Sequence, residues 1–260
     1  MSRLIEVKQT KNIAEVMLSR PDAYNAFNLE MITELAKVLT QLATDHSVRG
    51  IAITGQGKAF CAGGDLKWAI EFSEKTGSSF HALASQLHLT IVEIRRMKKP
   101  VVAAINGTAA GAGFSLALAC DFRIMEESAV LKQAYTSNGL CIDGGGTFTL
   151  PRLVGLARSL EIAAFDDPIP SAQALEWGLV TKVVNDGTSL EGAKNLLNRL
   201  AKKSTYSFGW SKRLLTDSFN NSLESHLEIE REGLSDCADN SDGQEGIKAF
   251  IEKRKPIFEN

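Results

Sequence analysis

The sequence has little of what marks membrane spans, secretion or nucleic-acid binding. Its 29 basic and 31 acidic residues give a formal charge of -2, which leaves no electrostatic footprint for nucleic acid or an anionic membrane. No apolar run approaches the roughly 20 residues that span a bilayer, and residues 1–7 lack the apolar core of a signal peptide. We therefore expect a cytoplasmic protein whose partner is a small molecule or another copy of the chain.

Cysteine is scarce as well. The chain has four cysteines in 260 residues, without CxxC spacing and without a histidine set to complete a metal site. This pattern excludes a disulfide framework and predicts reduced thiols and no metal. Cys61 lies inside a glycine-rich segment, but no histidine stands in the motif segments to activate it, so we reject it as a nucleophile.

The residues that are present favour an α/β fold. The composition is 44% hydrophobic, and strand-like runs alternate with helical patterns. Residues 4–18 predict a β-hairpin, Asn28 is a plausible helix N-cap, and a helix over residues 78–97 is stopped by Pro100. Such alternation is typical of an α/β core with crossover connections, which we place at residues 1–188. Residues 189–260 show helical patterns only, with a break at 236–242.

Two glycine-rich segments, residues 59–67 and 106–116, each join a strand-like run to a helical pattern. A tight turn from strand to helix leaves the first helical N–H groups without backbone partners. Two such turns facing each other would hold one oxygen on which negative charge develops. The alternative is that these glycines serve packing alone.

A third segment, residues 142–147, places Asp143 before three consecutive glycines. With the first two turns it suggests an oxyanion hole combined with an acid or base, although a turn or capping role for Asp143 remains open. Competing motifs fail. Leu116 stands where a dinucleotide fingerprint needs its third glycine, and no Gly-Lys-Ser or Gly-Lys-Thr occurs. Ser115 lacks the closing glycine of a nucleophile elbow and is expected to line a pocket.

Together with residues 19–26, 139–155 and 245–256, these segments resemble the crotonase (enoyl-CoA hydratase/isomerase) superfamily over nearly the whole chain. The resemblance implies a spiral of ββα units followed by a helical trimerisation region. It also implies an acyl-CoA thioester as substrate. No separate cofactor is expected, because CoA is part of that substrate.

The same resemblance assigns the thioester oxygen to the backbone N–H groups of Gly64 and Ala112. Fixed donors at these positions would stabilise an enolate more than the ground-state thioester. Asp65 is at the same time a plausible helix-start residue, and Lys253 and Arg254 are either contacts to a neighbouring subunit's CoA or a solvated basic face. The predicted substrate-binding residues are Ala62, Gly64, Asp65, Leu66, Lys67, Ala112, Ser115 and Tyr135.

The chain departs from the family pattern in its carboxylates. Typical hydratases of the family carry two glutamates, and alignment by the motifs places Ser115 and Tyr135 there. What remains is Asp143, at the position where some isomerases of the family carry a catalytic aspartate. We expect burial near Leu140, Ile142 and Phe148 to raise the pKa of Asp143 toward neutrality and make it a better base.

One carboxylate suffices for a 1,3-proton shift, so enoyl-CoA double-bond isomerisation through Asp143 is favoured over enoyl-CoA hydration. A third hypothesis for an enzyme is that Asp143 acts as a nucleophile, or as the base for ring cleavage or thioester chemistry. A member of the family that binds acyl-CoA or RNA without catalysis is the alternative from another class.

The apolar faces after residue 189 have no strands to cover them, so an interface is expected there, and the family resemblance implies a homotrimer or a dimer of trimers. These faces include Leu214, Leu215, Phe219, Leu223, Leu227 and Ile229.

Overall fold

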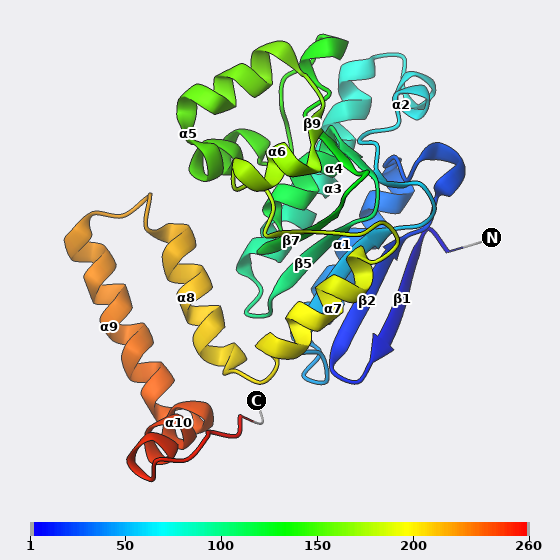
Figure 1. The fold of residues 1–260 in the computed structure, drawn as a ribbon. Coiled ribbons are helices and arrows are strands. Elements are labelled where there is room, and N and C mark those ends of the chain that lie inside the picture. The colour runs from blue at the N-terminus through cyan, green and yellow to red at the C-terminus, as the bar shows by residue number, and fades with distance from the viewer. Residues whose placement is uncertain (1–2, 259–260) are drawn as a thin grey trace.

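Six strands form the larger of two sheets in the computed structural model, which describes residues 3–258 (Figure 1). The first pair is the expected hairpin and is antiparallel, whereas the four neighbouring pairs that follow are parallel. In spatial order the strands are β1 (Ile5–Thr10), β2 (Ile13–Leu18), β3 (Gly50–Gly55), β5 (Val101–Ile105), β7 (Phe122–Glu126) and β10 (Lys182–Val184).

A second sheet takes the strands that directly follow β3, β5 and β7 in the chain. Its order is β4 (Ala59–Cys61), β6 (Thr108–Ala110), β8 (Val130–Lys132) and β9 (Ile169–Pro170). Three successive pairs of strands therefore contribute one strand to each sheet before the chain enters a helix. This alternation builds the expected spiral of ββα units.

The central strands of the larger sheet are buried on both sides, because helices cover both faces of the sheet. Ile51 and Val101 pack with α1 (Leu29–Thr44) and α3 (Thr76–Arg96), which lie against each other. The alternate residues Ala52 and Val102 pack under α7 (Ser189–Leu200). The predicted N-cap of α1 is confirmed, since the Asn28 side chain accepts the N–H of Met31 at 2.9 Å.

The core contains further helices, of which α4 and α6 pack against strands of the second sheet. Their bounds are η1 (Pro21–Ala23), α2 (Leu66–Phe72), α4 (Ala112–Ala119), η2 (Thr136–Asn138), α5 (Gly146–Phe165) and α6 (Ser171–Glu176). All residues of α4 are buried, and α5 is kinked at Gly155, where φ is 75°.

The last three helices, α8 (Thr205–Asp217), α9 (Leu223–Asp239) and α10 (Ser241–Ile251), project from the core (Figure 1). The expected break at 236–242 falls between α9 and α10, where Asn240 caps the second helix. Helix α7 differs from these three helices because it packs on the larger sheet. The division at residue 189 nevertheless groups α7 with them.

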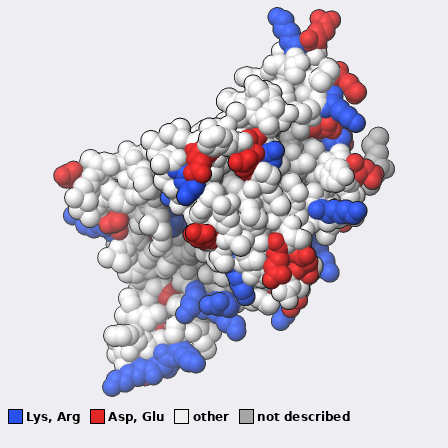
Figure 2. Space-filling model, turned by 45° about the horizontal axis from the view of Figure 1, so that its top comes forward, with Lys and Arg blue, Asp and Glu red and all other residues white. Residues whose placement is uncertain are grey.

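The described cysteines are all free, as predicted. Within residues 3–258, no helix is long and apolar enough to cross a membrane. On the face shown in Figure 2, acidic and basic side chains are mixed over the upper part, and basic ones gather on the lower part.

Candidate active site

The first glycine turn connects β4 to α2 and is held by Phe27. The N–H of Phe27 donates to the Gly63 carbonyl at 2.7 Å, and the N–H of Asp65 donates to the Phe27 carbonyl at 2.9 Å. These two bonds bracket Gly64, whose own N–H has no acceptor within residues 3–258. The turn thus presents one free backbone donor beside the start of a helix.

The second glycine turn connects β6 to α4. Gly111 adopts φ 52° and ψ -123°, and its N–H donates to the Lys132 carbonyl at 3.2 Å. Ala112 is the first residue of α4, so its N–H has no intrahelical acceptor, and the described part of the chain offers it no other. A second free donor therefore stands at the start of a second helix.

Close packing of the two turns requires glycine. A Cβ atom added at Gly113 would lie 2.2 Å from the carbonyl oxygen of Cys61, and one added at Gly63 would lie 3.3 Å from the backbone nitrogen of Ala112. The two turns are therefore in direct backbone contact. This contact places the donors of Gly64 and Ala112 in neighbouring turns, as an oxyanion hole requires.

Helix α3 relates the first turn to the segment that carries Asp143. Leu83 packs against Gly64, and Leu87, one helical turn later, packs against Gly144, with separations of 3.1 and 2.9 Å to the Cβ position of each glycine. One turn of helix advances by about 5.4 Å. Gly64 and Asp143 thus lie beside consecutive turns of one helix face, although 79 positions separate them in the sequence numbering.

Two contacts hold Asp143, one at its backbone carbonyl and one at its carboxylate. The Ser115 hydroxyl donates to its backbone carbonyl at 2.6 Å, and the Nε2 atom of His88 lies 2.6 Å from its Oδ1 atom. The other carboxylate oxygen, Oδ2, has no partner in the described residues. Asp143 therefore has one oxygen held by the protein and one available to a substrate.

The expectation that Asp143 is buried is wrong. Its side chain is 35% exposed, Leu140 is 36% exposed, and neither Ile142 nor Phe148 is fully buried. The glycines that follow Asp143 turn the chain back on itself, with φ of 62° at Gly144, and this leaves the carboxylate at the surface.

His88 is the functional candidate that the sequence did not reveal. It lies on α3, next to Leu87 in the buried stripe, and its side chain is 56% exposed. The sequence signal was weak, because a polar residue at the edge of an apolar helix stripe is common. Only the packing of α3 against Gly144 brings this imidazole to the carboxylate.

Tyr135 lies close to the Ser115 side chain and the Asp143 backbone. Its hydroxyl oxygen is buried. Burial raises the pKa of Tyr135 well above its usual range, and the nearby Asp143 charge acts in the same direction. The phenol is therefore neutral and does not act as a base.

The substrate-binding residues predicted on the first turn lie at its surface. Ala62, Leu66 and Lys67 are exposed. Asp65 instead has a structural role, because its carboxylate accepts the N–H groups of Lys67 and Trp68 and pairs with Arg20 at 2.7 Å.

Charge and burial also separate structural groups from reactive ones. Although partial burial opposes it, hydrogen bonds from Trp68 and Arg20 lower the pKa of Asp65. Burial raises the pKa of the Cys61 thiol to about 12, so it is protonated at neutral pH and unsuited to nucleophilic attack. In the C-terminal segment, Arg254 forms ion pairs with Glu245 and Glu252, at 2.6 and 2.7 Å.

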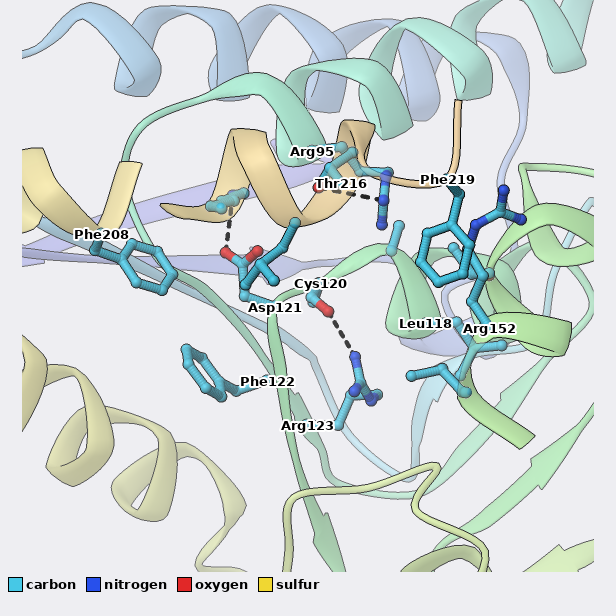
Figure 3. A pocket seen from close by; sticks show the side chains of 15 residues that line it. Arg95, Leu118, Cys120, Asp121, Phe122, Arg123, Arg152, Phe208, Thr216 and Phe219 are labelled. Atoms are coloured by element: carbon cyan, nitrogen blue, oxygen red, sulfur yellow. Dashed lines mark hydrogen bonds and ion pairs between the residues drawn. The ribbon is translucent and has the colours of Figure 1, made fainter. Parts of the chain in front are cut away.

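A cavity of about 420 Å³ lies elsewhere, where the end of α4, the start of β7, α5 and α8 meet. Figure 3 shows Arg95, Arg152 and Phe219 on one side of this cavity and Phe122 and Phe208 on the other. None of its lining residues belongs to the glycine turns or to the Asp143 segment. The backbone donors and the carboxylate, rather than this cavity, define the candidate active site.

Comparison with known proteins agrees with this fold. The enoyl-CoA hydratase/isomerase family model matches residues 8–260. The chain is 35% identical to 1,2-epoxyphenylacetyl-CoA isomerase of Escherichia coli over 249 residues, covering 95% of each chain. It is 33% identical to crotonyl-CoA hydratase of Syntrophomonas wolfei over 255 residues, covering 98% of this chain and 97% of that one.

A crystal structure of an enoyl-CoA hydratase from Polaromonas sp. JS666 superimposes with a TM-score of 0.93 at 33% identity, covering 98% and 99% of the two chains. The fold is thus the one shared by enzymes of the crotonase superfamily. The chain belongs to the enoyl-CoA hydratase/isomerase family of that superfamily and is an enzyme of this family.

Proposed function

We propose that the protein moves a carbon–carbon double bond in an enoyl-CoA thioester through an enolate intermediate. The observation that carries this proposal is a single carboxylate, Asp143, beside two glycine turns with free N–H donors. In the enolate the thioester oxygen bears more charge than in the substrate. Donors at Gly64 and Ala112 would therefore stabilise the intermediate preferentially, and each such donor is typically worth about 3 kcal/mol of barrier.

Asp143 would carry the proton. Its free Oδ2 atom takes a proton from the carbon next to the thioester, and the electron pair moves into the enolate. The same oxygen then returns a proton two carbons farther along the chain, which shifts the double bond. Such proton transfer by a positioned side chain typically contributes 10² to about 10⁴ in rate.

The side chains at the two positions expected for hydratase glutamates support isomerisation over hydration. Ser115 is buried, and its hydroxyl holds the backbone of Asp143. Tyr135 has a raised pKa and stays neutral. Neither residue is a base that would deprotonate water.

Hydration of a 2-enoyl-CoA is the second candidate, and the His88–Asp143 pair is the observation that favours it. Two titratable groups 2.6 Å apart, both partly exposed, would share the tasks of orienting and deprotonating a water molecule. One of the relatives is named a crotonyl-CoA hydratase. Another is named a 1,2-epoxyphenylacetyl-CoA isomerase, so cyclic acyl groups belong among the substrates to be tested.

Product analysis distinguishes these reactions. The protein is incubated with 3-enoyl-CoA, 2-enoyl-CoA and phenylacetyl-derived thioesters, and the products are identified by NMR and mass. We expect a shifted double bond without gain of water, and we expect Asp143→Asn to lose about 10² to 10⁴ of the rate while it still binds the thioester. Addition of water at about 10 per second, a typical enzyme turnover, would contradict isomerisation as the activity.

We further propose that the chain assembles as a trimer or a dimer of trimers through α8–α10. Leu215, Phe219, Leu223 and Leu227 are between 51% and 72% exposed, although Leu214 and Ile229 are half-buried. A cavity of about 560 Å³ between α8 and α9 has Leu227 in its lining. Apolar surface of this kind supports burial against another copy of the chain.

Sedimentation at micromolar concentration tests the assembly. We expect a mass of three or six chains for the wild type and a shift toward the monomer for Leu227→Glu, because a charge would be buried at the interface. Val7→Glu, an equivalent change on the edge strand β1, is the control and should leave the mass unchanged. A stable 28.2 kDa species for the wild type would contradict the interface.

A further inference from the structure

His88 and Asp143 form a pair that reaches from the candidate site to solvent. The Nε2 atom of His88 lies 2.6 Å from Oδ1 of Asp143, and the two side chains are 56% and 35% exposed. The other ring nitrogen, Nδ1, has no hydrogen-bond partner in the described part of the chain. One ring nitrogen of His88 therefore contacts the carboxylate, while the other is free to form a hydrogen bond with water.

The free Nδ1 atom gives this histidine a second contact, to solvent. The hydrogen bond made by one ring nitrogen sets which nitrogen carries the proton. No described residue holds Nδ1 of His88. While Asp143 is ionised, Nε2 donates its proton to Oδ1, and Nδ1 is free to exchange a proton with water.

We propose that His88 is a positioning residue for Asp143 that also exchanges the abstracted proton with solvent. This proposal rests on the enolate chemistry proposed above. Its consequence is that the hydrogen added to the product comes largely from water rather than from the substrate.

The transfers balance without a further reactant. A C–H bond next to the thioester breaks, its electron pair enters the enolate, and the proton forms an O–H bond on Asp143. The neutral carboxyl group then turns to present this proton to Nε2 of His88, whose own ring proton has moved to Nδ1 by exchange with water. Transfer to Nε2 gives an imidazolium and restores the carboxylate. The imidazolium loses a proton from Nδ1 to water, a solvent proton returns by the reverse route, and Asp143 delivers it to the product carbon.

The test is isomerisation of a 3-enoyl-CoA in D₂O by wild type, His88→Gln and the control His46→Gln. Glutamine keeps an N–H donor for Asp143 but cannot carry a proton through the side chain. His46 is exposed in the turn between α1 and β3. Deuterium in the product is measured by mass spectrometry within the first turnover.

We expect deuterium in most of the wild-type and His46→Gln product and about tenfold less in the His88→Gln product, whose isomerisation is slower but still measurable. Equal incorporation by His88→Gln and wild type would overturn the proposal. So would complete retention of substrate hydrogen by the wild type. A folded His88→Gln protein that neither isomerises nor exchanges would also contradict it, because His88 would then be needed for proton abstraction itself.

A second substrate separates this proposal from the proposed function. Phenylacetyl-CoA has acidic hydrogens next to the thioester but no chain double bond to move. One outcome is that the wild type exchanges these hydrogens in D₂O but shifts no double bond in 3-enoyl-CoA. That result would reject isomerisation and leave the proton relay through His88 standing. The effect of His88→Gln on the exchange would then test the relay. Isomerisation without exchange would reject the relay alone.

Discussion

The two glycine turns and the Asp143 segment are all rich in glycine, yet their glycines pack against different parts of the chain. A Cβ atom added at Gly113 would meet the backbone carbonyl of Cys61 at 2.2 Å, whereas one added at Gly144 would meet side-chain atoms of Leu87 and Ser115, at 2.9 and 3.0 Å. The two turns are close-packed backbone. The Asp143 segment instead packs against side chains of α3 and α4, and its carboxylate is partly exposed.

This difference matches what each part contributes. An oxyanion hole works through fixed dipoles, so its donors belong on backbone that cannot move. A proton carrier must reach more than one carbon of the substrate, and its orientation comes from neighbouring side chains. In this protein those neighbours are Ser115 on α4 and His88 on α3.

The strongest test of the comparison adds a methyl group to the close-packed turns. We expect Gly113→Ala to lower the free energy of unfolding by more than about 3 kcal/mol, because the new Cβ would overlap both the carbonyl and the Cβ atom of Cys61. Urea denaturation measures the change. Gly77→Ala on α3 is the control, since its Cβ meets no atom within 4 Å and helix propensity favours alanine. Equal stabilities for the two variants would show that the turns are not rigidly packed.

A smaller effect on stability is expected where Ser115 holds the Asp143 segment. Ser115→Ala removes the hydroxyl that donates to the Asp143 carbonyl, which should cost about 1 kcal/mol of stability. Turnover should fall by roughly 10-fold to 10²-fold, because a misplacement of about 1 Å can have that effect. Ser85→Ala is the control, since its hydroxyl also donates to a carbonyl, that of His81, but at an exposed position. Unchanged turnover in a folded Ser115→Ala protein would show that the segment needs no such attachment.

The smallest effect concerns the cap of the helix after the first turn. Asp65→Ala removes two hydrogen bonds at the start of α2 and the ion pair with Arg20, and we expect a loss of about 1 kcal/mol. The pKa of Asp65 is lowered in the folded protein, so its charge stabilises folding above the ordinary value of 3.8.

The gap in unfolding free energy between wild type and Asp65→Ala should therefore be full at neutral pH and shrink as the pH falls below that value. Denaturation curves between neutral and acidic pH measure it. A gap that stayed constant down to the acid limit would mean that the charge of Asp65 contributes nothing.

Much of the local structure could be predicted because it depends on neighbouring residues. The cap at Asn28, the end of α3 before Pro100 and the hairpin at the start of the chain all follow from short-range patterns. The repeat of ββα units was not visible as a sequence period, because β3, β5 and β7 begin at unequal intervals and share no motif.

The sequence by itself determined which groups are available for chemistry: two strand-to-helix glycine turns, one aspartate before a run of glycines, and no carboxylate at positions 115 and 135. It also placed the apolar residues of the last helices. These properties are local, since they depend on residue type and on spacing along the chain.

Only the tertiary structure decided that Asp143 is partly exposed, that α7 packs on the sheet, and that His88 meets a carboxylate 55 positions away. Exposure and contact between distant segments depend on how helices and turns pack in three dimensions. An apolar stripe on α3 predicts that the helix is buried on one side, but not which turn lies against it. The packing of Leu87 on Gly144 settles that choice, and it brings the imidazole to the carboxylate.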